Sequence, residues 1–132
     1  MTKILVIEDD PYVQRLYKRI FGFQNWDAQI ATDGIEGLRL AKELKPGFIL
    51  LDIMMPKMNG IDVLKKLKAD TDTRDIPVLI VTNFGQDENV RVAMSLGAEG
   101  VLVKLNTPPD LLIKKIQEYV ESKEQSQLKG EK

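Results

Sequence analysis

Four runs of consecutive apolar residues divide the chain, and none of them alternates with polar residues. They lie within Lys3–Ile7, Phe48–Leu51, Val78–Val81 and Val101–Val103. Uninterrupted apolar runs of this kind are typical of strands buried on both faces, as in a parallel sheet. A fifth stretch, Asp27–Ala31, is more polar, which favours a strand at a sheet edge. The pattern therefore predicts five strands.

Between these strands, apolar residues recur at helical spacing. Five helices are expected: one from Pro11 to Gly22, one that begins at Asp33 and stops at Pro46–Gly47, one after Gly60, one over Gln86–Leu96 and one that begins at Thr107. The second should bury the stripe Ile35, Leu38, Ala41 and Leu44, and the fourth the stripe Val90, Ala93 and Met94. Strands that alternate with helices imply an α/β domain, a doubly wound parallel sheet covered on both faces.

Composition narrows the classes of function. The chain has 132 residues, which suits one domain, and its net charge of -1 without a basic block argues against nucleic-acid binding. It contains no cysteine and no histidine, which excludes thiol chemistry, imidazole metal sites and histidine general bases. No apolar run approaches the ~20 residues of a membrane span, and no signal peptide is recognisable. We therefore expect a cytoplasmic protein without membrane insertion.

The end of the chain differs from the rest in composition. From Glu121 onward it has almost no apolar residues. Such a segment cannot bury enough apolar surface to fold by itself. We expect a folded domain over residues 1–121 and a polar tail over residues 122–132, either a frayed helix or disordered.

Polar residues follow four of the predicted strands. Glu8 and Asp9 follow the first, Asp52 the third, Thr82 the fourth and Lys104 the fifth. Each has an ordinary explanation by itself, as a helix cap, a β-branched strand residue or a solvated charge. In a parallel sheet, however, the carboxyl ends of the strands meet at one edge, where the sites of open α/β sheets are built. Together these residues predict a functional pocket.

The charges of this pocket indicate its chemistry. Three carboxylates contribute -3 and Lys104 contributes +1, so one divalent cation would bring the sum to zero. Mg²⁺ fits, because it prefers hard oxygen ligands and binds phosphate oxygens. Carboxylate nucleophiles form aspartyl-phosphates, and a metal, an ammonium and a hydroxyl are the groups that neutralise a transferring phosphoryl group.

The same residues resemble the receiver domains of two-component response regulators, of the single-domain chemotaxis-regulator type. The motifs that carry the resemblance are Ile-Leu-Val-Ile-Glu8-Asp9-Asp-Pro, Leu-Asp52-Ile-Met-Met-Pro-Lys-Met-Asn-Gly, Val-Thr82, Gly97-Ala98 and Lys104. It extends over nearly all of the chain, from Lys3 to Val120. The resemblance implies a flavodoxin-like receiver fold over residues 1–121, with five parallel strands in the order 2-1-3-4-5.

The resemblance also implies a role for each site residue. Asp52 matches the phosphoacceptor. Thr82 and Lys104 match the hydroxyl and the amine that bind the phosphoryl oxygens. The implied Mg²⁺ ligands are Glu8, Asp9, Asp52 and the backbone carbonyl of Met54.

Three positions depart from the family pattern. Val101 stands where a switch aromatic is usual, Leu105 follows Lys104 in place of proline, and Asn83 follows Thr82 in place of a very small residue. The family's cis bond after the lysine would cost about 2.5–4 kcal/mol before a non-proline residue. We therefore expect a trans Lys104–Leu105 bond and a switch that works through Thr82 and Val101 without an aromatic rotor.

Three functions remain open at this point. The leading hypothesis is a stand-alone receiver that takes a phosphoryl group from a histidine kinase or phosphotransfer protein and switches binding to an output protein. Its catalysis would be limited to its own phosphorylation and dephosphorylation. The alternatives are a Mg²⁺-dependent aspartyl-phosphate phosphohydrolase and a phosphorelay intermediate. The hydrolase usually needs a second acid just after the nucleophile, whereas Ile53 and Met54 follow Asp52. A degenerate receiver that binds constitutively is disfavoured by the intact acidic set.

Overall fold

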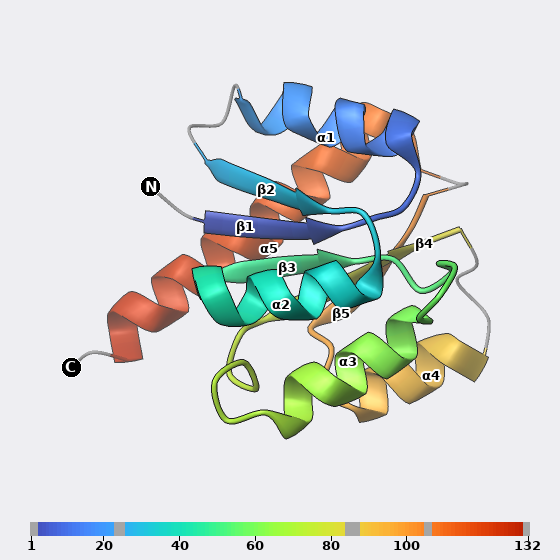
Figure 1. Ribbon diagram of the computed structural model, residues 1–132. Helices are drawn as coiled ribbons and strands as arrows, with labels where there is room; N and C mark the ends of the chain where they lie inside the picture. The colour runs from blue at the N-terminus through green and yellow to red at the C-terminus, as the bar shows by residue number, and fades with distance from the viewer. Residues whose placement is uncertain (1–2, 23–25, 84–87, 105–106, 131–132) are drawn as a thin grey trace.

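The apolar runs form a five-stranded parallel sheet in the computed structural model, which describes residues 3–22, 26–83, 88–104 and 107–130 (Figure 1). The strands are β1 (Lys3–Ile7), β2 (Asp27–Ala31), β3 (Phe48–Leu51), β4 (Val78–Thr82) and β5 (Gly100–Val103). Their order in the sheet is β2-β1-β3-β4-β5, and every neighbouring pair is parallel. The predicted fold class and strand order are confirmed.

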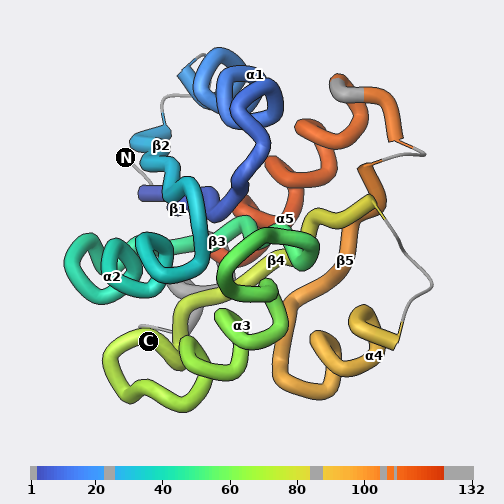
Figure 2. The backbone as a smooth tube through the Cα atoms, turned by 45° about the vertical axis from the view of Figure 1, so that its right-hand side comes forward, coloured from blue at the N-terminus to red at the C-terminus, as the bar shows by residue number. Residues whose placement is uncertain are grey.

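Helices cover both faces of this sheet. They are α1 (Pro11–Gly22), α2 (Gly34–Leu44), α3 (Gly60–Ala69), α4 (Glu88–Ser95) and α5 (Pro109–Gly130). Helices α1 and α5 pack on one face, and α2, α3 and α4 pack on the other (Figures 1 and 2). Within the described ranges, none of the helices combines the length and the apolar character that a bilayer span requires.

The two faces of the sheet explain the uninterrupted apolar runs. Successive side chains of a strand point to opposite faces. In β1, Ile4 and Val6 enter the core under α1 and α5, whereas Leu5 and Ile7 enter the core under α2, α3 and α4. Apart from Lys3, every position of β1, β3 and β4 is therefore buried. We call these two clusters the α1/α5 core and the α2–α4 core.

The helix starts follow local capping chemistry. Asp33 caps α2, because its side chain accepts a hydrogen bond from the Glu36 backbone N at 2.9 Å, as the capping-box spacing predicts. The side chain of Asn59 likewise accepts from the backbone N of Ile61 at 2.7 Å and caps α3. This cap fixes where the chain turns after β3.

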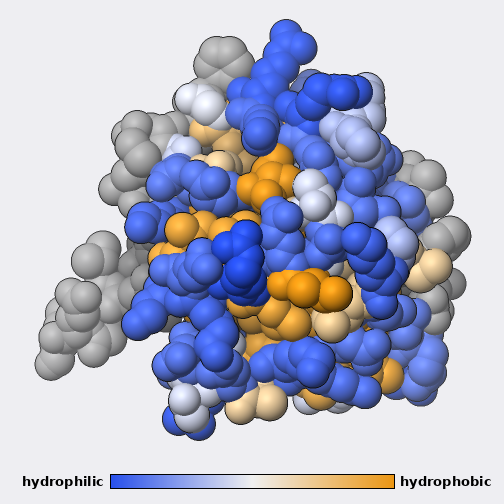
Figure 3. Space-filling view, viewed as in Figure 1, coloured by the Kyte–Doolittle hydropathy of each residue, from blue (hydrophilic) through white to orange (hydrophobic). Residues whose placement is uncertain are grey.

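Two predicted helix stripes are each wrong at one residue. In α2, Ala41 is buried and Leu38 packs, partly buried, against the α2–α4 core as predicted, but Ile35 is 59% exposed and the helix also buries Gly34 and Gly37. A Cβ on Gly37 would lie 2.6 Å from the Ile7 side chain, so this helix approaches the sheet through glycines, which carry no apolar signal in the sequence. The face with α2 and α3 in front accordingly shows separate hydrophobic patches among hydrophilic residues (Figure 3).

The second wrong stripe lies on α4. Met94 is 46% exposed, and Ala93 is the buried residue of this short helix. The partly buried Val92 and Leu96 pack beside Ala93, so the contact row runs at 92, 93 and 96 rather than through Met94.

At the end of the chain, α5 continues to Gly130, beyond the domain boundary expected after residue 121. Its buried residues are Leu112, Ile113, Ile116 and Val120, as the helical spacing predicts. The division between domain and tail stays a prediction.

Gly60 offers a test of how tightly the turn after β3 packs. A Cβ at this position would lie 2.2 Å from the backbone oxygen of Asp52 and 2.6 Å from the Cα of Ile53. Because these are backbone atoms, Gly60→Ala should lower the free energy of unfolding by about 3 kcal/mol or more. A Cβ at Gly22, the last residue of α1, meets nothing within 4 Å, so Gly22→Ala should change stability by less than about 1 kcal/mol. Urea denaturation of both variants measures the contrast, and equal losses would contradict it.

Candidate functional site

The sheet hydrogen bonds continue past the strand ends and place polar residues side by side. The backbone N of Asp52 donates to the oxygen of Ile7 at 3.1 Å, and the backbone N of Lys104 donates to the oxygen of Thr82 at 2.7 Å. Glu8 also continues the ladder, by a bond of its backbone N to the oxygen of Ala31. The predicted residues therefore meet at the carboxyl edge of the sheet.

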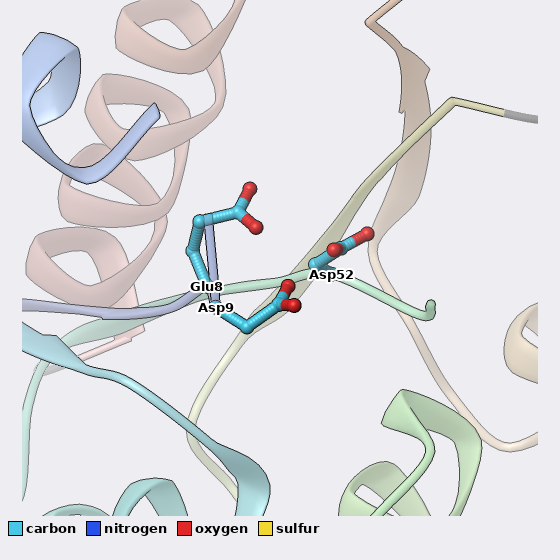
Figure 4. Close-up of side chains that lie close together, drawn as sticks. All are labelled: Glu8, Asp9 and Asp52. Atoms are coloured by element: carbon cyan, nitrogen blue, oxygen red, sulfur yellow. The ribbon is translucent and has the colours of Figure 1, made fainter. Parts of the chain in front are cut away.

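Three carboxylates gather at this edge. Glu8, Asp9 and Asp52 each offer one oxygen, and these oxygens lie within 4.8 Å of one another. Figure 4 shows Glu8 and Asp9 beyond the end of β1 and Asp52 beyond the end of β3, with the Asp9 carboxylate turned toward Asp52. Glu8 and Asp52 are 2% and 7% exposed. Because close, buried like charges repel strongly, the cluster favours a bound cation.

Lys104 supplies the positive charge of the site. Its Nζ lies 2.8 Å from Oε1 of Glu8 and 3.8 Å from Oδ1 of Asp52. The side chain is only 13% exposed, so its ammonium group lies inside the cluster. The tighter of its two contacts is with Glu8.

The electrostatics of Asp52 reflect this crowding. Burial raises the pKa of Asp52 to about 7, Lys104 opposes the rise, and the charges of Glu8 and Asp9 add to it. One ammonium group thus does not balance three carboxylates. A divalent cation with a preference for oxygen would stabilise the ionised form of Asp52, and the donor set here is all oxygen.

The remaining predicted residues flank this cluster. Thr82 ends β4 and is 1% exposed. Val101 pairs with Ile80 in the sheet and packs, partly buried, against the α2–α4 core. The Met54 side chain is 54% exposed, so only its backbone is suited to a role inside the site. Leu105 lies outside the described residues, and the predicted trans Lys104–Leu105 bond lies there with it.

Two residues of α1 lie at the site although their sequence positions did not indicate it. The side-chain amide of Gln14 donates to the backbone oxygen of Glu8 at 2.6 Å and so holds the end of β1. Tyr17 lies in the α1/α5 core, where burial raises the pKa of its hydroxyl and the charges of Glu8 and Asp52 raise it further. A tyrosine in an otherwise apolar stripe was the available signal.

Comparison with known proteins gives the family context of this geometry. Residues 4–117 match the family described as "Response regulator receiver domain". The chain is 40% identical over 104 residues to the "DNA-binding dual master transcriptional regulator RpaA" of Synechocystis, covering 79% of this chain and 43% of that protein. It thus spans less than half the length of this curated relative.

Solved structures share the fold over nearly the whole chain. A CheY-like response regulator receiver domain protein from Methanospirillum hungatei superimposes with a TM-score of 0.85 at 26% identity, covering 96% of this chain and 98% of that one. The BeF3-activated N-terminal receiver domain of Klebsiella pneumoniae RstA superimposes with a TM-score of 0.78 at 27% identity, covering 89% of this chain and 97% of that one.

Because the pKa of Asp52 is raised, the free energy of unfolding of the metal-free protein should fall as Asp52 ionises with rising pH. A carboxyl whose pKa is higher in the folded than in the unfolded state stabilises the fold at low pH, and this contribution is lost as pH rises from about 4 through about 7. Asp52→Asn should therefore match the native protein near pH 4 and exceed its free energy of unfolding by about 2–4 kcal/mol at pH 8.

Urea denaturation at several pH values with a chelator present measures this difference. Asp62→Asn, an exposed change on α3, serves as the control and should follow the native profile. A difference between Asp52→Asn and native protein that stays constant from pH 4 to pH 8 would show that the Asp52 carboxylate is not destabilised by its surroundings.

Proposed function

The chain belongs to the response regulator receiver domain family, and on this premise we propose that it is a phosphorylation-switched signalling module whose phosphoacceptor is Asp52. The observation that carries the proposal is the placement of Asp52. Its carboxylate is buried at the carboxyl edge of the central strand, 3.8 Å from Lys104 and beside Glu8 and Asp9. Asp9 keeps partial exposure, so the cluster opens to solvent on that side.

The proposed chemistry is a phosphoryl transfer to a carboxylate. An oxygen of Asp52 attacks the phosphorus of a phosphohistidine on a histidine kinase or phosphotransfer protein. The P–N bond breaks as the new P–O bond forms, and the imidazole leaves with the electron pair and takes up a proton. Lys104 and Thr82 are proposed to bind the oxygens of the transferred group, which carry its negative charge.

Mg²⁺ is the cofactor that fits this site best. Glu8, Asp9 and Asp52 present hard oxygen donors within 4.8 Å of one another, and the backbone carbonyl of Met54 follows two residues after Asp52. We propose these four groups as the residues that hold the ion. When bound, the ion neutralises charge on the carboxylates and on the phosphoryl oxygens.

Phosphorylation is proposed to act on the protein through Thr82 and Val101. A phosphoryl group makes the charge at Asp52 more negative, from -1 to about -2. The added charge attracts the Thr82 hydroxyl and the chain after it. Val101, on the neighbouring strand β5, is too small to act as an aromatic rotor, so the response is proposed to proceed without one.

The output and the cellular context remain proposals. A partner protein that reads the phosphorylated state is proposed as the output, and relay of the phosphoryl group to another protein is the second route. The relative RpaA is described as DNA-binding and is more than twice as long as the matched segment. For this chain, the absence of nucleic-acid binding and the cytoplasmic location stay predictions.

A phosphohydrolase is the less favoured function. Ile53, directly after Asp52, is 2% exposed and apolar, and Met54 carries no acid. The acid/base that would release product from an aspartyl-phosphate has no candidate at these two positions. We expect no turnover of small phosphate esters beyond the slow loss of the protein's own phosphoryl group.

Phosphorylation by a small acyl phosphate tests the central proposal. With acetyl phosphate and Mg²⁺, the protein should gain one phosphoryl group, seen by intact mass. Asp52→Ala should gain none, because the nucleophilic carboxylate is missing. Asp62→Ala, which removes an exposed aspartate from α3, is the matched control and should be labelled like the native protein. Labelling that persists in Asp52→Ala would refute the assignment.

Metal binding is tested by thermal unfolding. An ion that binds only the folded state stabilises it, by about 2.7 kcal/mol at 100 times its Kd. Millimolar Mg²⁺ should therefore raise the melting temperature of the native protein and of Asp62→Ala. Asp9→Ala should lose most of this rise, since it removes a proposed ligand. An equal rise in Asp9→Ala and native protein would place the ion elsewhere.

A further inference from the structure

The hydroxyl of Tyr17 lies inside the protein near the site, and the proposed function gives it no role. Tyr17 is 2% exposed and belongs to the α1/α5 core. Its oxygen has no hydrogen-bond partner among the described residues. A buried hydroxyl without a partner costs free energy, and phenylalanine would fill the same space without that cost. Packing alone therefore does not account for a tyrosine here.

The strand geometry directs Glu8 toward the same core as Tyr17. Ile4 and Val6 of β1 belong to the α1/α5 core, and Glu8 is the next residue in that alternating row. The row is not broken at the strand end, because the backbone of Glu8 still bonds to Ala31. Asp52 follows Leu50 of the α1/α5 core in the same way.

The tyrosine ring is held in place and its hydroxyl keeps its proton. The ring stacks on Phe21, with 5.6 Å between centroids and 7° between planes. Burial, then the charge of Glu8, then that of Asp52 raise the pKa of Tyr17 above its ordinary value. Toward a carboxylate, the hydroxyl is therefore a donor only.

The main hydrogen-bond donor to Glu8 is Lys104, which phosphorylation of Asp52 would attract. Its carboxylate accepts from Lys104 Nζ at 2.8 Å and, more weakly, from the backbone N of Asp10 at 3.3 Å. A phosphoryl group on Asp52 adds about one negative charge close to Lys104. The lysine is a point charge on a flexible stem, so it turns toward that charge and its contact with Glu8 weakens. A Mg²⁺ ion held by Glu8 would occupy one carboxylate oxygen, and the other oxygen, in a residue that is 2% exposed, then needs another donor.

We propose that Tyr17 is a positioning residue whose hydroxyl hydrogen-bonds the Glu8 carboxylate in the phosphorylated state, as Lys104 turns to the phosphoryl group. The inference rests on the proposed function. It assigns the two states different partners for Glu8: the ammonium group of Lys104 at rest, and the phenol of Tyr17 after phosphorylation. Tyr17 acts through Glu8 and does not touch the reacting atoms.

Beryllofluoride with Mg²⁺ is the probe of the phosphorylated state, since a related receiver domain is described as BeF3-activated. Tyr17→Phe removes one oxygen atom and keeps the ring. Without the probe, this variant should melt at a higher temperature than the native protein, because an unpartnered buried hydroxyl is gone. With the probe, it should gain less and bind beryllofluoride about tenfold more weakly. Tyr12→Phe, at a 69% exposed tyrosine of α1, is the control and should match the native protein in both measurements.

A second pair of variants tests whether the effect of Tyr17→Phe depends on Glu8. In Glu8→Ala, where the acceptor itself is gone, adding Tyr17→Phe should change beryllofluoride affinity less than twofold, measured at a Mg²⁺ concentration that saturates this variant. An unchanged tenfold loss in that background would show that the hydroxyl serves another group and would overturn the proposal. Equal destabilisation of Tyr17→Phe with and without the probe would do the same, since it indicates a permanent partner such as a bound water. Failure of the native protein to respond to the probe would instead reject the proposed function.

Discussion

A single ammonium group shared between buried carboxylates governs the carboxyl edge of this sheet. Lys104 lies 2.8 Å from Glu8 and 3.8 Å from Asp52, and both acids are almost fully buried. Burial raises the pKa of Asp52 to about 7, and the single ammonium group offsets only part of this rise. The edge is therefore held in a state of incomplete neutralisation, which a metal ion or a change in the lysine's position can relieve.

The rest of the architecture keeps this group of charges in place. Two apolar cores hold the strands from both sides, and the ladder of backbone bonds continues one residue past the strand ends. The acids thus project from rigid strands instead of loops, which limits their freedom to separate. A carboxylate cluster on flexible loops would relax apart, and its pKa values would return to ordinary ranges.

The sequence predicted the elements and the gathering of polar residues at one sheet edge because the relevant signals are local. Apolar runs, the Asp33 cap and the polar residue after each strand are all visible in short windows, and parallel pairing brings those polar residues together. The sequence predicted Ala41 on the buried face of α2 but not the start of that face, because Gly34 and Gly37 make the contact there and Ile35 is exposed. It also did not predict that Lys104 lies closer to Glu8 than to Asp52. Lys104 and Glu8 are 96 residues apart in the sequence, and their distance depends on how their side chains extend in the folded protein.

The turn that begins at Asp52 has a mechanical consequence. Gly60 packs so closely on the backbone of Asp52 and Ile53 that no side chain fits between them, and its backbone N bonds to the oxygen of Ile53 at 2.8 Å. The backbone of Asp52 and Ile53, on one side of the site, thereby packs directly against the first turn of α3. Backbone atoms therefore restrain Asp52 on this side, and no side chain can rearrange there to let the strand end shift. A movement of α3 would accordingly be transmitted directly to the position of the Asp52 carboxylate.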